Sequence, residues 1–273
     1  MNAHEKTHEE AGPAPMPAYT TLKAVIRYDG ATYAGWQVQP DETTVQGCIE
    51  AALSRLAKGP VRIHGASRTD AGVHAFGQVF SWQWPREASL RRLQRSLCKM
   101  LGPRLRIESI EPAPDGFHAR KSAHSKRYAY VLHLTRHPDP FLHRYAWAIP
   151  WELDLALLDA LAARITGTHD FAGFQCRGSS CRQTVRTLFS VARRPGPLVG
   201  PQDLPGVWRL ELHGDGFLYK MVRNLVGTLV YIARGNLPPE HLETLLHRPG
   251  PYHGYTAPPH GLFLKEVLYP DVR

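Results

Sequence analysis

The sequence predicts an α+β fold built from two tandem ferredoxin-like or RRM-like halves, each with the element order β-α-β-β-α-β. Three observations support this prediction. Segments in which apolar and polar residues alternate, as in strands, occur in both halves of the chain. Each half also has two segments with the apolar stripe of an amphipathic helix. Finally, these segments follow the same order in both halves, so we expect mainly antiparallel sheets with helices on one face and a cleft between the halves.

The size of the chain agrees with two halves. At 273 residues, of which 43% are hydrophobic, the chain can form about two domains of ordinary size. We predict an N-terminal half over residues 20–116 and a C-terminal half over residues 117–273. Residues 1–19 are polar and rich in Pro and Ala, without the apolar core of a signal peptide, and are predicted to be a disordered leader.

The first half begins with residues 21–30, which alternate and end at Asp29-Gly30, a strand followed by a turn. Residues 43–59 predict an amphipathic helix, because Thr43 and Gln46 have the spacing of a capping box. Its apolar face is expected to consist of Val45, Ile49, Ala52, Leu53 and Leu56.

The rest of the first half contains strands around a second helix. Short strands are expected at residues 61–64 and 105–110. A longer strand is expected at residues 76–84, with one side formed by Phe76, Gln78, Phe80, Trp82 and Trp84. Residues 88–102 predict a helix whose leucines face inward and whose outward face carries Arg91, Arg92, Arg95 and Lys99.

The second half repeats the order of elements. Strands are expected at residues 126–134, 184–192, 207–214 and 261–269. Helices are expected from the apolar stripe of Leu155, Leu158, Ala162 and Ile165, and over residues 216–235, the longest helix. The segments 136–150, 166–183 and 193–206 are rich in Pro, Gly, Ser and His and are predicted to be loops.

The charge of the chain favours a polyanionic partner, either a nucleic acid or an anionic membrane surface. Lys and Arg number 33 against 24 acidic residues, and residues 86–136 alone carry a net charge of +8. If the partner is a nucleic acid such as RNA, we expect contacts with its phosphate backbone from this basic segment, with Arg91, Arg92 and Arg95 as candidates, and also from Arg177, Arg182 and Arg186. The alternative is a solvated basic face without a ligand.

Other features narrow the class of protein. No run of about 18 apolar residues is present to span a membrane, and a cytoplasmic protein is expected. The four cysteines are too scattered for a disulfide scaffold, and Cys176 and Cys181 lack the close spacing of a zinc knuckle. We expect reduced thiols.

The most unusual stretch is HGASRTDAGVHAFGQ, residues 64–78, which places an arginine, a carboxylate and an imidazole on one tight connection between strands. Asp70 beside a glycine is commonly a turn residue whose carboxylate accepts a hydrogen bond from a nearby backbone amide. Asp70 and His74 are also possible metal ligands, but two ligands do not form a site and no further partner has a suitable spacing. No metal is therefore predicted.

The motif ASRTDAGVHA resembles the active-site motif of the tRNA pseudouridine synthase A family. Four further stretches resemble the family in the same order: YDGATYAGWQ, FHARKSAHSKRYAY, FLYKMVRNLVG and APPHGLFL. Together the five stretches extend the resemblance over residues 20–270, nearly the whole chain. Two positions depart from the family pattern, because Ser67 stands where many members have Gly and Phe263 where many have Tyr.

The resemblance implies a function and a set of site residues. It implies isomerisation of uridine to pseudouridine at positions 38, 39 and 40 of tRNA anticodon stem-loops, without a cofactor, by a homodimer. It also implies that Asp70 is the catalytic aspartate and that Arg68 belongs to the same motif. Tyr128 would stack on the target base, and Arg223 would pair with the aspartate.

Two other functions stay open at the level of sequence. A non-catalytic RNA-binding module would explain the charge and the fold, although the chain lacks the RNP pattern of glycines and aromatics on a central strand. A metal-dependent nuclease using Asp70 and His74 would lose its activity in the presence of a chelator.

Overall fold

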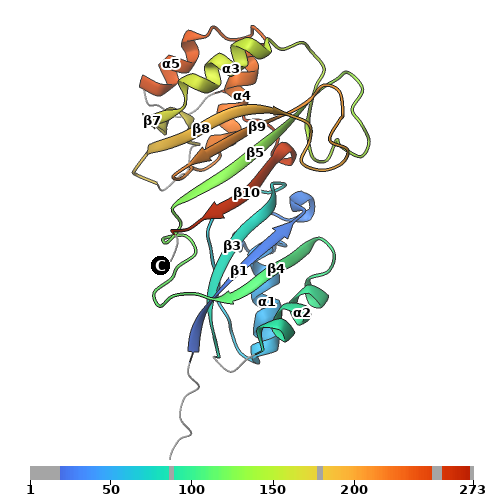
Figure 1. Cartoon of the computed structure of the whole chain (residues 1–273), viewed down its shortest axis with the longest axis vertical. Coiled ribbons are helices and arrows are strands. Elements are labelled where there is room, and N and C mark those ends of the chain that lie inside the picture. Colours follow the sequence, from blue (N-terminus) through green and yellow to red (C-terminus); the bar gives the residue numbers. More distant parts are fainter. Residues whose placement is uncertain (1–18, 86–88, 177–180, 248–253, 271–273) are drawn as a thin grey trace, which may run out of the picture.

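The computed structural model describes residues 19–85, 89–176, 181–247 and 254–270. Residues 1–18 of the predicted leader lie outside this part of the chain, and Tyr19 is the first residue of a strand. The described chain forms one ten-stranded sheet with the order β4-β1-β3-β10-β5-β9-β8-β7, to which β2 is added beside β3 and β6 beside β5. Figure 1 shows α1 and α2 packed on the half that contains β1, and α3, α4 and α5 on the half that contains β5.

The N-terminal half has the predicted element order. Its elements are β1 (Tyr19–Tyr28), η1 (Gly30–Thr32), α1 (Val45–Ala57), β2 (His64–Gly65), β3 (His74–Pro85), α2 (Leu90–Leu101) and β4 (Leu105–Pro112). Neighbouring strands in the order β4-β1-β3-β2 are all antiparallel. In place of the strand expected at residues 61–64, the chain forms only the two-residue strand β2 (His64–Gly65).

The C-terminal half also has the predicted elements and adds two strands, one α-helix and two 3₁₀ helices that were not predicted. It consists of β5 (Ser125–Leu134), β6 (Trp147–Ile149), α3 (Leu155–Arg164), β7 (Gly167–Asp170), η2 (Phe171–Phe174), β8 (Val185–Pro195), β9 (Val207–Gly214), α4 (Met221–Ala233), α5 (Glu240–His247), η3 (Pro259–Gly261) and β10 (Leu262–Leu268). The order β10-β5-β9-β8 is antiparallel throughout and corresponds to β4-β1-β3-β2. β6 and β7 lie in the predicted loops 136–150 and 166–183, whereas α5 follows the predicted helix 216–235 in a segment for which no element was predicted.

The two halves are joined through a short parallel pairing of β3 with β10, where His74 lies opposite Phe263 and Ala75 opposite Leu264. The two strands lie side by side at the middle of the molecule (Figure 1). A β-carbon at Gly77 would lie 2.5 Å from the carbonyl oxygen of Lys265, so only glycine permits this close approach. The separate sheets of the prediction are therefore one continuous sheet.

The packing of α1 corrects two details of the prediction. Thr44, not Thr43, caps the helix, and its hydroxyl accepts a hydrogen bond from the amide of Gly47. Val45, Ile49 and Leu53 are fully buried, but Leu56 in the last turn is 37% exposed.

The alternation of side chains between the two faces of the sheet is interrupted along β3, so Phe76 lies on a different face from the one predicted. The pairing of β1 with β3 shifts register between Ile26 and Tyr28, as in a β-bulge. Phe80 and Trp82 join the main core, whereas Phe76 stacks on Phe263 with ring centroids 5.3 Å apart in a smaller cluster. The prediction that all five alternating residues share one side is therefore wrong at Phe76.

The helix predicted over residues 216–235 is α4, which begins later, at Met221, and is as long as α1 rather than longer. Lys220 precedes it with a φ of 59°, so the chain turns sharply before the helix starts. Eleven of its thirteen residues are buried, which makes α4 the central helix of the C-terminal half. None of the helices in the described ranges has the length and apolar character needed to cross a bilayer.

Candidate active site

The loop between β2 and β3, residues 66–73, lies at the junction of the two halves and is held by several hydrogen bonds. The side-chain amide of Gln78 accepts from the backbone N–H of Ser67, at 3.1 Å, and donates to its carbonyl, at 2.7 Å. The amide of Trp36 donates to the carbonyl of Thr69, and the hydroxyls of Tyr28 and Thr69 lie 2.8 Å apart. The loop is therefore fixed on both sides of Arg68 before any ligand binds.

Asp70 occupies the corner of a tight turn, but its carboxylate does not close that turn. The turn is closed by the backbone, because the amide of Val73 donates to the carbonyl of Asp70 at 3.1 Å. Gly72 supplies the positive φ of 78° that the turn requires. Within the described residues, no backbone amide donates to the Asp70 carboxylate, which disagrees with the interpretation of Asp70 as a turn-forming residue.

The Asp70 carboxylate pairs instead with Arg223, which is 153 residues away in α4. Nη1 of Arg223 lies 2.7 Å from Oδ2 of Asp70. The two side chains are only 12% and 13% exposed, and Nε of Arg223 donates to the carbonyl of Ala257 at 2.7 Å. The contact with Ala257 holds the guanidinium in place. The guanidinium in turn offers a positive charge and a hydrogen bond to the carboxylate of Asp70, which is nearly buried.

Tyr128 of β5 approaches the same loop from the C-terminal half. Its hydroxyl lies 2.7 Å from Oγ of Ser67, and its ring packs edge-on against Phe217 with centroids 4.9 Å apart. Burial raises the pKa of Tyr128 to about 12, and the hydrogen bond to Ser67 only partly opposes this shift. The phenol is therefore neutral at physiological pH and can donate or accept a hydrogen bond.

These residues line one cleft of about 960 Å³. The cleft is bounded by residues 34–42 before α1, by the loop that carries Asp70, by Tyr128 and by residues 217–223 at the start of α4. Arg68 lines it as well, with an exposed side chain that has no hydrogen bond or ion pair in the described part of the chain. The structure thus brings Asp70, Arg68, Tyr128 and Arg223 to one site.

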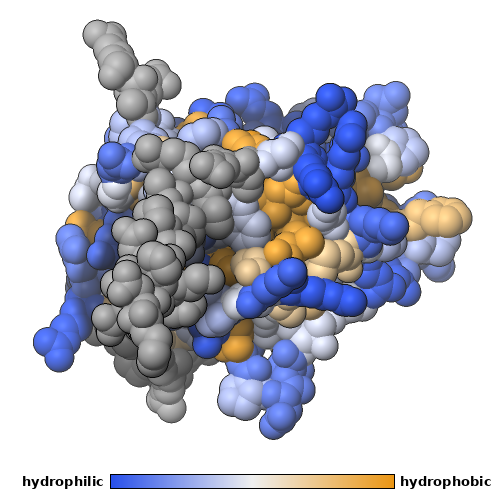
Figure 2. Space-filling model, turned by 90° about the horizontal axis from the view of Figure 1, so that it is seen from below, coloured by the Kyte–Doolittle hydropathy of each residue, from blue (hydrophilic) through white to orange (hydrophobic). Residues whose placement is uncertain are grey.

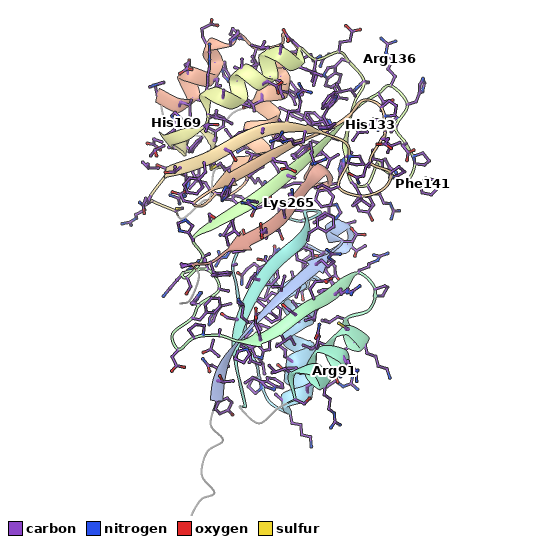
Figure 3. All side chains as sticks on the ribbon, in the orientation of Figure 1. Arg91, His133, Arg136, Phe141, His169 and Lys265 are labelled. Atoms are coloured by element: carbon purple, nitrogen blue, oxygen red, sulfur yellow. The ribbon has the colours of Figure 1, made fainter. Side chains whose placement is uncertain are left out.

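The arginines of α2 lie elsewhere. Arg91, Arg92 and Arg95 are exposed on the outer face of the helix and do not line the cleft. Figure 3 shows Arg91 at the end of the molecule remote from the junction of the halves. Figure 2 views the molecule from this end, and it shows hydrophilic side chains that project around a smaller hydrophobic area.

Two further residues, His74 of the motif and Tyr130 of β5, lie outside the cleft and have structural roles. His74 is buried at the joint of the halves, where its Nδ1 lies 3.1 Å from both the amide of Gly30 and the carboxylate of Asp29. It is not part of the cleft lining, and within the described ranges no three His, Cys, Asp or Glu side chains form a group that could hold a metal ion. Tyr130 is fully buried, and its hydroxyl donates to the carbonyl of Pro258, so it is a core residue.

The sequence interpretation missed several residues of the cleft wall, including Trp36, Lys126, Phe217 and Lys220. Lys126 could have been found, because it lies two residues before Tyr128 on a strand and therefore faces the same side of the sheet. Trp36, Phe217 and Lys220 lie in the stretches YDGATYAGWQ and FLYKMVRNLVG that resemble the family, but their place in the cleft wall is visible only in three dimensions.

Comparison with known proteins identifies relatives along nearly the whole chain. Residues 24–120 and 161–270 match the model of a family described as tRNA pseudouridine synthase. The chain is 39% identical over 251 residues to tRNA pseudouridine synthase A of Streptococcus mutans. The aligned region covers 91% of this chain and 98% of the relative. It is 38% identical over 250 residues to the protein of the same name from Geobacter sulfurreducens, with 91% and 99% covered.

Proposed function

The chain belongs to the tRNA pseudouridine synthase family, and on this premise we propose that it isomerises uridine to pseudouridine at positions 38, 39 and 40 of tRNA anticodon stem-loops. The observation that carries the assignment of the site is the Asp70 carboxylate, which lines the cleft and is paired with Arg223 at 2.7 Å. We place the activity in the cytoplasm.

The reaction conserves every atom of the base and sugar. The bond between N1 of uracil and C1′ of ribose breaks, the base turns, and a bond forms between C5 and C1′. The proton on C5 is lost and N1 gains a proton. No external oxidant, reductant or group donor is needed, so the proposed reaction requires no cofactor.

We assign to Asp70 the role of nucleophile or charge stabiliser while the base is detached. A carboxylate can fill this role only if it is ionised and accessible to substrate. Arg223 supports the ionised form of Asp70 through its charge and a hydrogen bond. Because Asp70 lines the cleft, a substrate bound there can reach its carboxylate. The remaining carboxylate oxygen, Oδ1, makes no hydrogen bond with the described residues and is the one we assign to the substrate.

The target base must leave the stacked stem-loop to reach Asp70, at a cost of a few kcal/mol. We propose that Arg68, whose exposed guanidinium has no partner within the described ranges, fills the vacated stack. Tyr128 would hold the flipped base through its ring, and its neutral hydroxyl would assist the removal of the C5 proton. Both residues lie in the wall of the cleft that contains Asp70.

We further propose that a homodimer binds the tRNA, with the anticodon arm contacting both subunits. The basic residues are spread from the cleft to the remote α2 helix, a distribution suited to a ligand much larger than one nucleotide. Light scattering at micromolar concentration tests this proposal, because a fully active monomer would contradict it.

The proposed activity is tested by mapping pseudouridine in tRNA incubated with the purified protein. We expect modification at positions 38, 39 and 40, unaffected by EDTA. Tight tRNA binding without any pseudouridine would instead favour the non-catalytic RNA-binding module, and loss of activity with EDTA would favour a metal-dependent reaction.

A further inference from the structure

Lys126 of β5 lies in the cleft wall beside the loop that carries Asp70. Residues two apart on a strand face the same side, so Lys126 and Tyr128 both point towards the cleft. Nζ of Lys126 donates to the carbonyl of Ala66 at 2.8 Å, and the hydroxyl of Tyr128 bonds to the next residue, Ser67. Two side chains of one strand thus hold the beginning of the loop.

The charge of Lys126 is not balanced by the protein. No carboxylate forms an ion pair with it in the described part of the chain, and the charged groups that face its ammonium are Arg120, from the segment before β5, and Arg186 of β8. Burial, followed by the repulsion of these two arginines, lowers the pKa of Lys126 to about 8. Because the described residues provide no anion for Lys126, a ligand that supplies negative charge would offset the repulsion that the two arginines exert on its ammonium.

Arg120 lines the cleft, and Arg186 contacts a residue of its wall. Arg120 is exposed and lines the cleft with Lys126. Arg186 lies behind Cys181, another residue of the cleft wall, with Nη2 3.5 Å from Sγ. The ammonium of Lys126 has three N–H donors, and the bond to Ala66 uses one of them.

We infer that Lys126, Arg120 and Arg186 form a binding site for one phosphate of the RNA backbone, and that Lys126 links this site to the position of the aspartate loop. The inference rests on the proposed RNA substrate and adds a positioning residue to it. A bound phosphate would hold the ammonium between itself and the carbonyl of Ala66, four residues before Asp70. Correct RNA binding would thereby strengthen the contact of Lys126 with the start of the loop.

The first experiment measures tRNA binding against salt for Lys126→Met and Lys126→Arg. Each phosphate contact contributes about one unit to the slope of log affinity against log salt concentration, so the Met variant should lose about one unit and the Arg variant should keep the slope. Lys265→Met is the matched control. It also removes one lysine charge, but from the opposite side of the sheet, and Arg209 still pairs with Glu211 there. Lys265 is labelled on β10 in Figure 3.

The second experiment measures the proton taken up when tRNA binds in weak buffer near pH 8. Close to its pKa of about 8, Lys126 is only half protonated in the free protein, and a phosphate would draw in roughly the missing half proton. Lys126→Arg should bind with the same salt slope but without this uptake, because arginine is always charged. A residue with a purely structural role would not produce this difference.

The third readout is kcat at saturating tRNA, which should fall in Lys126→Met because the loop loses its anchor. Unchanged salt slope, proton uptake and kcat in this variant, with an active wild-type protein, would overturn the inference alone. If the wild type forms no pseudouridine but shows the expected slope and uptake, the phosphate site stands and the proposed function fails. If Lys126→Met does not fold, Arg120→Met, which removes the exposed arginine of the same site, should lose about one unit of salt slope, and an unchanged slope in that variant would overturn the inference.

Discussion

The hydroxyl of Tyr128 lies 2.7 Å from Oγ of Ser67, so the aromatic residue of β5 is tied to the loop three residues before Asp70. The bond crosses from the C-terminal to the N-terminal half. A glycine at position 67, as many members of the family have, has no side chain to make it. In this chain the position of the ring and the position of the aspartate loop are therefore connected through one serine.

Replacement of Tyr128 by Phe should preserve stacking and remove the hydroxyl. We predict near-normal tRNA affinity and a fall in kcat of about 10²-fold, the size of a typical contribution from a proton-transfer group. Because the pKa of Tyr128 is raised to about 12, its ionisation should cause no step in the pH–rate profile of the wild type near neutrality. Ser67→Ala is the control, since it removes the same hydrogen bond and leaves the phenol in place. A Tyr128→Phe variant with full kcat would show that only the ring matters.

Arg223→Met should be more damaging than a surface arginine substitution. It leaves the Asp70 carboxylate nearly buried without its partner and removes the bond to Ala257. Removal of one partner of a buried ion pair costs about 3–5 kcal/mol, so we expect a clearly lower unfolding midpoint together with loss of turnover. In the double variant Asp70→Asn/Arg223→Met, much of this stability should return, because no charge is left unpaired. Additive losses in chemical denaturation would contradict the coupling of the two residues.

The local pattern of the sequence was sufficient to predict most elements, but not how the halves join. Amphipathic stripes and alternation depend on neighbours a few residues apart, and they predicted α1, α2, β5 and β9 closely. They failed where one extra residue changes the pairing, as at the register shift between β1 and β3, where the extra residue in β3 turns Phe76 to the other side of the sheet. They also failed for β6 and β7, whose three and four residues are too few to show a period.

The site could be predicted only in part for the same reason. Asp70, Arg68, Tyr128 and Arg223 were found through the resemblance to a family, and the structure brings them to one cleft. The contact between Asp70 and Arg223 joins residues 153 positions apart and leaves no local signal. The importance of Ser67 and Lys126 depends on which carbonyl or hydroxyl they reach, and this becomes visible only in three dimensions.

Neutralising Arg91, Arg92 and Arg95 together to Gln should weaken tRNA binding and flatten its salt dependence, because each arginine that binds a phosphate adds about one unit to the salt slope. These residues lie on α2, outside the cleft, so kcat at saturating tRNA should not change. An unchanged slope, measured by filter binding over a range of salt concentrations, would identify the three arginines as a solvated helix face.

The stability of the joint between the halves should depend on pH through His74. Burial lowers the pKa of His74 below its usual value, although the nearby Asp29 carboxylate opposes the shift. The unfolded chain therefore binds the proton more readily than the folded one, and stability is lost as the pH falls below about 6.5, the ordinary histidine pKa. In His74→Asn, whose side-chain oxygen can accept from the amide of Gly30, the unfolding midpoint should fall less between about pH 7.5 and pH 5.5 than in the wild type. Equal pH dependence of the two proteins would mean that His74 does not contribute to it.

The central claim is that the Asp70 carboxylate performs the chemistry, and Asp70→Asn tests it most directly. Asparagine keeps the shape and the hydrogen-bonding capacity of a turn residue but removes the charge. Pseudouridine should be mapped in tRNA incubated with equal amounts of wild type and variant, with binding and the unfolding midpoint measured in parallel. We predict no measurable pseudouridine with the variant and near-normal tRNA binding. The variant removes the charge partner of the nearly buried Arg223, but the side-chain oxygen of Asn can still accept a hydrogen bond from the guanidinium, so the midpoint should fall less than in Arg223→Met. Substantial pseudouridine formation by Asp70→Asn would contradict the account and leave Asp70 with only the structural role of pairing with Arg223.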